Sequence, residues 1–203
     1  MTAIPIKFQT FLNKLNTKNV RLIKSDIVYG VYDNSAIKGF NNIPKGIQNF
    51  YSEIELLNCK WELVDYDNQI NYLDKEIDIV CGEINIPKID FFEQKPILDF
   101  LDPYKIFDSS LQEDLSQYVP FDYITSELAI CYKKNKRNNK QDRLYLCDFS
   151  EKGLIREIDI TVLDYLEEGY KSYFFSKWQE SSFFYDKTRK KLIDFYCSQL
   201  FKE

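Results

Sequence analysis

The chain has 203 residues, of which 44% are hydrophobic and 29% are charged, and its formal net charge is −5. This composition is ordinary for a soluble globular protein, and the acidic balance disfavours nucleic-acid binding through a general field of cations. The chain contains no histidine, which excludes His-based general-base catalysis, His metal ligands and the usual Ser-His-Asp triad.

The first third of the sequence predicts two helices and several strands. Apolar residues at helical spacing from Phe8 to Leu15 predict an amphipathic helix. Two short strands are predicted at residues 20–23 and 27–32, with a turn at residues 24–26 between them.

The second helix is predicted over residues 44–57, and a strand at residues 59–63 follows it. Pro44 fits a helix start, where the missing N–H of proline leaves no hydrogen bond unmade. Cys59, Trp61 and Leu63 alternate with charged residues, as in a half-buried strand. The apolar residues at helical spacing are Ile47, Phe50, Tyr51, Ile54 and Leu57.

Beyond these elements, alternation near residues 77–81 and 84–86 predicts strand residues, with Gly82 as a bulge or turn between them.

The segment at residues 90–127 is rich in carboxylates and is the best candidate for contact with a partner. It holds nine Asp or Glu against two Lys, and its three prolines predict loops around a short helix at residues 111–118. Carboxylates can oppose the cations with which a nuclease holds phosphates. A solvated acidic loop is the alternative, and a calcium site is disfavoured because the ligand spacing of an EF-hand is missing. The predicted partner-binding residues are Asp99, Asp102, Asp108, Glu113 and Asp114.

The last third of the sequence predicts a hairpin, one more strand and two helices. The hairpin strands are residues 127–132 and 143–147, joined by a cationic connection. This connection either forms a mobile tip or grips nucleic acid or an acidic partner. A strand is predicted at residues 154–158. Thr161 is predicted to cap a helix with Leu163 and Phe174 beside its apolar face. That face consists of Val162, Leu166, Tyr170 and Tyr173. The last helix is expected to begin at residue 186 or 188 and to end near residue 200. Helices, then strands, then helices favour an antiparallel α+β domain.

Four of these segments, in this order, resemble the SUKH superfamily of Smi/Knr-type proteins. They are residues 44–51 with Phe50 and Tyr51, the strand with Trp61, the hairpin end with Asp148, and the helix from residue 162 that leads to Trp178. The resemblance spans about residues 40–180 and implies a curved central antiparallel sheet flanked by helices, in one domain over residues 1–203. Residues 181–203 would form a C-terminal helical extension. Pro44, Phe50, Tyr51, Trp61, Asp148 and Trp178 would then be mainly structural residues.

The resemblance implies a non-enzymatic binder. Many bacterial members are immunity proteins that neutralise polypeptide toxins, often nucleases, and fungal relatives regulate cell-wall synthesis. An immunity protein is therefore the leading expectation, and a regulatory or scaffold module with another partner is the alternative. A carboxylate-dependent hydrolase that uses Glu83 and Asp148 as acid and base is the third.

No basic leader or long apolar segment is present, and the five cysteines include no Cys-x-x-Cys pair. We therefore expect a cytoplasmic protein with reduced thiols, no cofactor, no metal and no direct contact with membrane or nucleic acid. The aromatic residues between Tyr165 and Tyr185 either fill a core beneath the last helix or form an exposed anchor patch.

Overall fold

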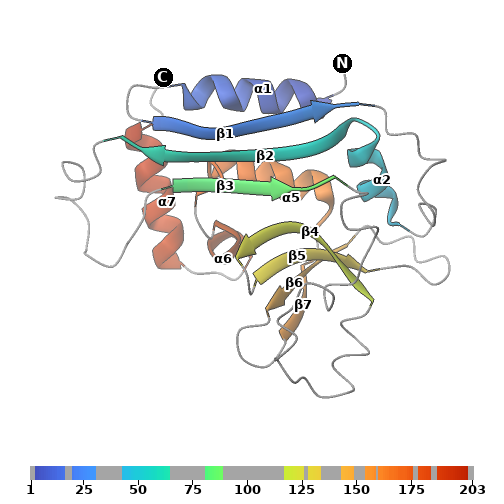
Figure 1. Ribbon diagram of the computed structural model, residues 1–203. Coiled ribbons are helices and arrows are strands. Elements are labelled where there is room, and N and C mark those ends of the chain that lie inside the picture. The colour runs from blue at the N-terminus through green and yellow to red at the C-terminus, as the bar shows by residue number, and fades with distance from the viewer. Residues whose placement is uncertain are drawn as a thin grey trace, which may run out of the picture. The chain divides into compact units, whose positions relative to one another are not determined.

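A computed structural model gives the fold of the protein. It describes residues 3–16, 20–30, 43–64, 81–88, 117–125, 128–133, 143–148, 154–158, 160–175, 178–183 and 187–200. The described elements confirm the α+β class: antiparallel strands form two sheets, and helices accompany them (Figure 1). None of the described helices has the length and apolar character needed to cross a membrane.

The chain divides into two compact units, each assembled from segments that are distant in sequence. Unit 1 comprises Met1–Asp26, Asn58–Ile84 and Leu166–Glu203, and unit 2 comprises Ile27–Leu57 and Asn85–Tyr165. The single domain expected from the sequence stays a prediction.

The first sheet has the strand order β1-β2-β3, and each strand runs opposite to its neighbour (Figure 1). Its strands are β1 (Val20–Tyr29), β2 (Ile54–Leu63) and β3 (Cys81–Ile86). The turn predicted at residues 24–26 is wrong, because β1 runs unbroken through them. Hydrogen bonding to a neighbouring strand overrides the weak local preference for a turn. The turn proposed at Gly82 is also wrong, since β3 continues through it.

Helix α2 (Lys45–Tyr51) is shorter than the sequence predicts. Pro44 precedes its first turn and its carbonyl accepts the N–H of Gln48 at 3.0 Å, while the N–H of Ser52 closes the other end on Gln48. Ile54 and Leu57 therefore belong to β2, where both are buried.

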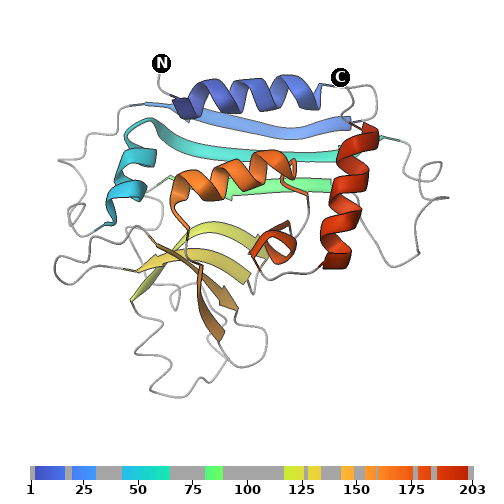
Figure 2. The ribbon, with the colours of Figure 1, turned by 180° about the vertical axis from the view of Figure 1, so that it is seen from behind.

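Aromatic rings join α1 (Ala3–Leu15) to the end of α5 (Val162–Lys171) inside unit 1. Phe11 stands edge-on to Phe174 with ring centroids 5.2 Å apart, and Phe8 lies 6.2 Å from Tyr170. Figure 2 shows the end of α5 against the side of β2 and β3 that faces away from the viewer in Figure 1. The predicted first helix is confirmed, and its buried Phe8 and Phe11 form this contact.

Two of the remaining helices lie where the sequence predicts them, and the structure adds one at residues 178–183. Thr161 and Asp164 exchange hydrogen bonds at the start of α5, where the Asp164 N–H donates to the Thr161 hydroxyl at 3.2 Å. Leu163, expected beside the apolar face, is instead 57% exposed. Helix α6 (Trp178–Phe183) precedes α7 (Lys187–Leu200), which buries Ile193.

The second sheet lies in unit 2 and has the order β4-β5-β6-β7, all antiparallel. The predicted hairpin is confirmed as β5 (Leu128–Lys133) and β6 (Leu144–Asp148), and the strand after it as β7 (Leu154–Ile158). Strand β4 (Tyr118–Thr125) corrects the prediction of loops up to residue 127. A helix is predicted at residues 111–118, but its last residue, Tyr118, is the first residue of β4. Residues 111–116 lie outside the described residues.

A second aromatic cluster forms the core of unit 2. Phe50 contacts Tyr51 and Phe121 with centroids 5.1 and 5.3 Å apart, and the Phe121 ring also meets Tyr165. The Tyr165 hydroxyl donates to the buried Asp122 carboxylate, which also accepts the backbone N–H of Asn85 at 2.9 Å. This buried carboxylate therefore has partners and helps to fix the core.

Candidate functional site

Strands β2 and β3 have two unlike faces within unit 1, and the exposed one is the candidate site. Alternation along β2 buries Cys59 and Trp61 on one face and turns Lys60 and Glu62 to the other. We call the second face, together with the matching residues of β1 and β3, the sheet face. Its residues are Arg21, Ile23, Lys60, Glu62, Cys81 and Glu83.

The buried face is held by Trp61, which is fully buried. Its indole N–H donates to the carbonyl of Tyr173 at 2.8 Å, and its ring stands edge-on to Phe175 at 4.8 Å. A Cβ at Gly82 would lie closer than 3.0 Å to three atoms of the indole, nearer than real Cβ atoms approach. Only glycine at residue 82 therefore leaves room for Trp61.

The residues that contact Trp61 follow the end of α5, where the backbone has an unusual conformation. Tyr173 and Phe174 both have φ of 51°, the left-handed region that aromatic residues rarely adopt. The Phe174 N–H donates to the carbonyl of Gly169 at 2.9 Å, and the Phe174 carbonyl accepts the N–H of Glu83 at 2.8 Å. Phe175 forms an isolated antiparallel β-bridge with Gly82. The strained turn thus attaches α5 to the edge of β3 and fixes the strands that carry the sheet face.

The sheet face carries alternating charges that pair across its strands. Arg21 of β1 pairs with Glu62 of β2, and Lys60 of β2 pairs with Glu83 of β3 at 2.9 Å. The hydrogen bond from Lys60 to Glu83 raises the pKa of the lysine above its usual value of 10.5, and the carboxylate charge adds to this effect. These four charged residues sum to zero, so the face offers ordered charges of both signs rather than one strong field.

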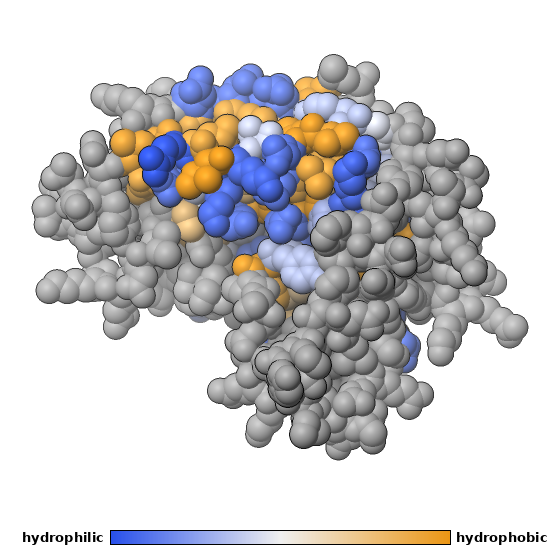
Figure 3. Space-filling view, viewed as in Figure 1, coloured by the Kyte–Doolittle hydropathy of each residue, from blue (hydrophilic) through white to orange (hydrophobic). Residues whose placement is uncertain are grey.

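Strand β1 is exposed on both of its faces. All six residues from Arg21 to Asp26 are exposed, including Leu22 at 42% and Ile23 at 48%. Figure 3 shows hydrophobic and hydrophilic surface intermingled over β1 and β2 on this side. Strands normally bury at least one face, so the stretch Arg21–Asp26, which is exposed on both faces, has surface to offer a partner.

Cys81 is the thiol on the sheet face, and it is half-buried in β3. Burial raises its pKa, the Lys60 cation lowers it in part, and Glu83 raises it. Behind it on β2, burial raises the pKa of the Cys59 thiol to about 12. All five cysteines are free.

The structure places the residues singled out in the sequence as follows. Phe50 and Tyr51 are buried in unit 2, whereas Trp61 and Trp178 are fully buried in unit 1. The rings of Phe50 and Tyr51 contact Phe121, and the ring of Trp61 contacts Phe175. Asp148 ends β6, opposite Leu128 and Leu154.

The carboxylates predicted to meet a partner lie outside the described residues: Asp99, Asp102, Asp108, Glu113 and Asp114.

The acid–base pair considered for a hydrolase is split between the units: Glu83 belongs to unit 1, where it pairs with Lys60, and Asp148 belongs to unit 2. Across the described part of the chain, no three His, Cys, Asp or Glu side chains gather in a way that could hold a metal ion.

Sequence reasoning missed the sheet face. The signal was present in β2, where Lys60 and Glu62 flank Trp61 and mark the exposed half of an alternating strand. What the sequence could not reveal is that Arg21 and Glu83, distant along the chain, meet these two residues.

The chain matches no protein-family model, no curated protein and no solved structure.

Proposed function

We propose that this protein is a non-enzymatic binding protein of the immunity type, which neutralises a polypeptide toxin by covering it. The sheet face and the exposed strand β1 are the proposed contact surface. The observation that carries the proposal is the run of exposed residues from Arg21 to Asp26, in which the apolar Leu22 and Ile23 stand among charges. The SUKH-like order of motifs supplies the class of partner.

The exposed side chains of β1 suit a polypeptide partner, because they offer apolar and charged contacts side by side. Helix α1 runs along the edge of β1 that faces away from β2 (Figures 1 and 2), so the contact is made through side chains. Leu22 and Ile23 point to opposite faces of β1, and both are exposed.

The charged pairs of the sheet face add selectivity. A partner must present charges that match Arg21, Lys60, Glu62 and Glu83 in order, and a mismatch costs free energy when the pairs are dehydrated. The packed face behind these residues keeps the strands in place before the partner arrives, which lowers the entropic cost of binding.

Co-expression tests the proposal. A toxin-sized open reading frame immediately upstream of this gene is the partner to try, and the protein should rescue cells from its product. Changing both Leu22→Lys and Ile23→Lys should lower affinity for that product at least about tenfold and abolish rescue, because two apolar contacts are lost.

The matched control is Leu163→Lys, which alters another exposed leucine, in α5, and should leave rescue intact. If the β1 variant still rescues cells and binds the toxin with full affinity, β1 is not part of the contact surface. If the unaltered protein gives no rescue, the immunity function is wrong.

The acidic segment makes a separate contribution in this proposal. Long-range attraction to a cationic toxin accelerates encounter more than it slows release. Replacing its five predicted carboxylates by Asn or Gln should therefore slow association and flatten its dependence on salt, as stopped-flow mixing can measure. An unchanged association rate would show that the segment is only a solvated loop. The replaced residues are Asp99, Asp102, Asp108, Glu113 and Asp114.

A further inference from the structure

A groove between α1 and the end of α5 lies wholly within unit 1 and is separate from the residues of the sheet face. Its volume is about 480 Å³, which is within the range of small-molecule sites, roughly 300–1,000 Å³. Three aromatic rings line it: Phe11 of α1 lies 5.7 Å from Tyr170 and 6.0 Å from Tyr173, centroid to centroid. Such rings favour a flat apolar body.

The rim of the groove is cationic. Lys7, Lys14 and Lys171 line it together with Glu167. When Glu168, which pairs with Lys171, is counted as well, the three cations and two carboxylates sum to +1. The chain as a whole carries −5. The groove therefore concentrates positive charge against the trend of the protein, which favours an anionic occupant.

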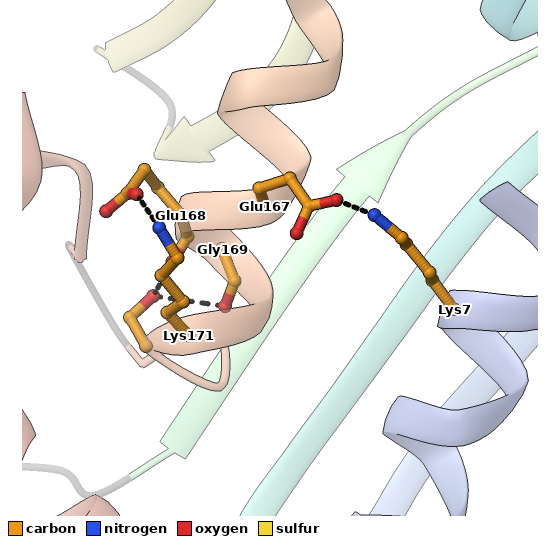
Figure 4. Close-up of polar contacts among 6 residues, drawn as sticks. Lys7, Glu167, Glu168, Gly169 and Lys171 are labelled. Carbon is orange, nitrogen blue, oxygen red and sulfur yellow. Dashed lines mark hydrogen bonds and ion pairs between the residues drawn. The ribbon is translucent and has the colours of Figure 1, made fainter. Parts of the chain in front are cut away.

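The lysines of the rim are close to the groove and open to solvent. Figure 4 shows Glu167 of α5 reaching Lys7 of α1, while Lys171 turns back to Glu168 in its own helix. These pairs are exposed, and exposed ion pairs are weak, so an incoming anion can share or replace the carboxylates at little cost.

The wall of the groove is fixed in advance. Tyr173 is held by its left-handed backbone, and its carbonyl accepts the hydrogen bond of the buried Trp61 indole. Ring contacts of Phe11 with Tyr170 and Tyr173 join the two helices along the groove. A site that needs no rearrangement loses little conformational entropy when it binds.

From this lining we propose that the groove binds a small aromatic carboxylate. The ring system lies against Phe11, Tyr170 and Tyr173, and the carboxylate accepts hydrogen bonds from Lys14 and Lys171 at the rim. This site is independent of the proposed polypeptide-binding function, and either can fail without the other.

Two probes of matched shape test the site: naphthoate and its neutral amide, naphthamide. We expect naphthoate to shift backbone amide resonances within residues 7–14 and 167–173 of the full chain. Its dissociation constant should be at least about tenfold lower than that of naphthamide, because only the anion gains charge-assisted hydrogen bonds.

Variants then assign the charge. K14Q with K171Q should weaken naphthoate binding about tenfold and leave naphthamide unchanged, and both lysines are exposed, so the fold is kept. K60Q, which alters an exposed lysine of the sheet face, should leave both affinities unchanged. Equal affinity for the two probes, no binding up to several millimolar, or shifts confined to other residues would each overturn the proposal.

Discussion

The two faces of β2 and β3 differ in burial, although adjacent residues of the same strands form them. On one face, Trp61 fills the space above Gly82 and takes its hydrogen-bond partner from the end of α5. On the other, one residue away along each strand, Lys60 and Glu83 pair in contact with water. Substitutions at neighbouring residues therefore have different costs. On the first face close packing restricts which side chains fit, and on the second face solvent screens the interactions between charges.

This difference separates tests of the fold from tests of function. A change on the buried face alters the free energy of unfolding, and any loss of binding that follows is indirect. A change on the sheet face leaves the fold nearly intact, so a loss of binding there reports contact with the partner.

The largest effect is expected from Trp61→Ala. Removing the indole leaves a cavity and takes the hydrogen-bond donor from the Tyr173 carbonyl, which should cost about 4 kcal/mol of unfolding free energy. Urea unfolding followed by circular dichroism measures it. Lys60→Ala, at the adjacent residue of the sheet face, should cost less than about 1 kcal/mol. Similar costs for the two variants would mean that the faces do not differ as described.

Gly82→Ala tests the same face by adding an atom instead of removing several. The new methyl group would overlap the indole of Trp61, so we expect a loss of about 2–3 kcal/mol in unfolding free energy. Gly30→Ala is the matched control, because its nearest neighbour would be Glu55 at an ordinary 3.7 Å.

Combining Gly82→Ala with Trp61→Phe sharpens this test, since the smaller ring vacates part of the space. The double variant should be less destabilised than the sum of the single ones, which is the signature of direct contact. Strict additivity would contradict the overlap.

The same contrast explains which elements the sequence could predict. The β5–β6 hairpin and helices α1, α5 and α7 have regular apolar patterns, and the structure confirms them. In β2 the alternation is interrupted, since Glu55 and Leu56 are both half-buried between the buried Ile54 and Leu57. That spacing of three imitates a helix, which is why the second helix was predicted too long.

Two strands gave misleading patterns for other reasons. Strand β1 buries almost nothing, so no apolar alternation marks it. Strand β4 contains Pro120 and an irregular register around it, and proline in a strand is a signal for a loop. The sheet face depends on pairs between distant residues, Arg21 with Glu62 and Lys60 with Glu83, and no local pattern encodes such pairs.

Thiol chemistry should distinguish the two faces with an effect of about tenfold in rate. The thiolate is the reactive form, and burial raises the pKa of Cys59 to about 12, whereas the Lys60 cation partly offsets the rise at the half-buried Cys81. Iodoacetamide near neutral pH should alkylate Cys81 at least about tenfold faster than Cys59, as peptide mass spectrometry can follow. In denaturant the two rates should converge. Equal rates in the native protein would show that the buried face opens as readily as the exposed one.

The smallest effect is expected from the Lys60–Glu83 pair at alkaline pH. Its hydrogen bond raises the pKa of Lys60 above 10.5 in the folded state. The stabilisation of the folded state by this pair is therefore fully present below pH 10.5, and it is lost as the pH rises through the raised pKa of Lys60. Because the lysine is exposed, screening limits the contribution to about 0.5 kcal/mol. Tyrosines and other lysines titrate in the same range, so the measurement is the difference in urea midpoint between the unaltered protein and Glu83→Gln. That difference should shrink between about pH 8 and about pH 11.5, and a constant difference would show that the pair contributes to stability through packing and not through its charges.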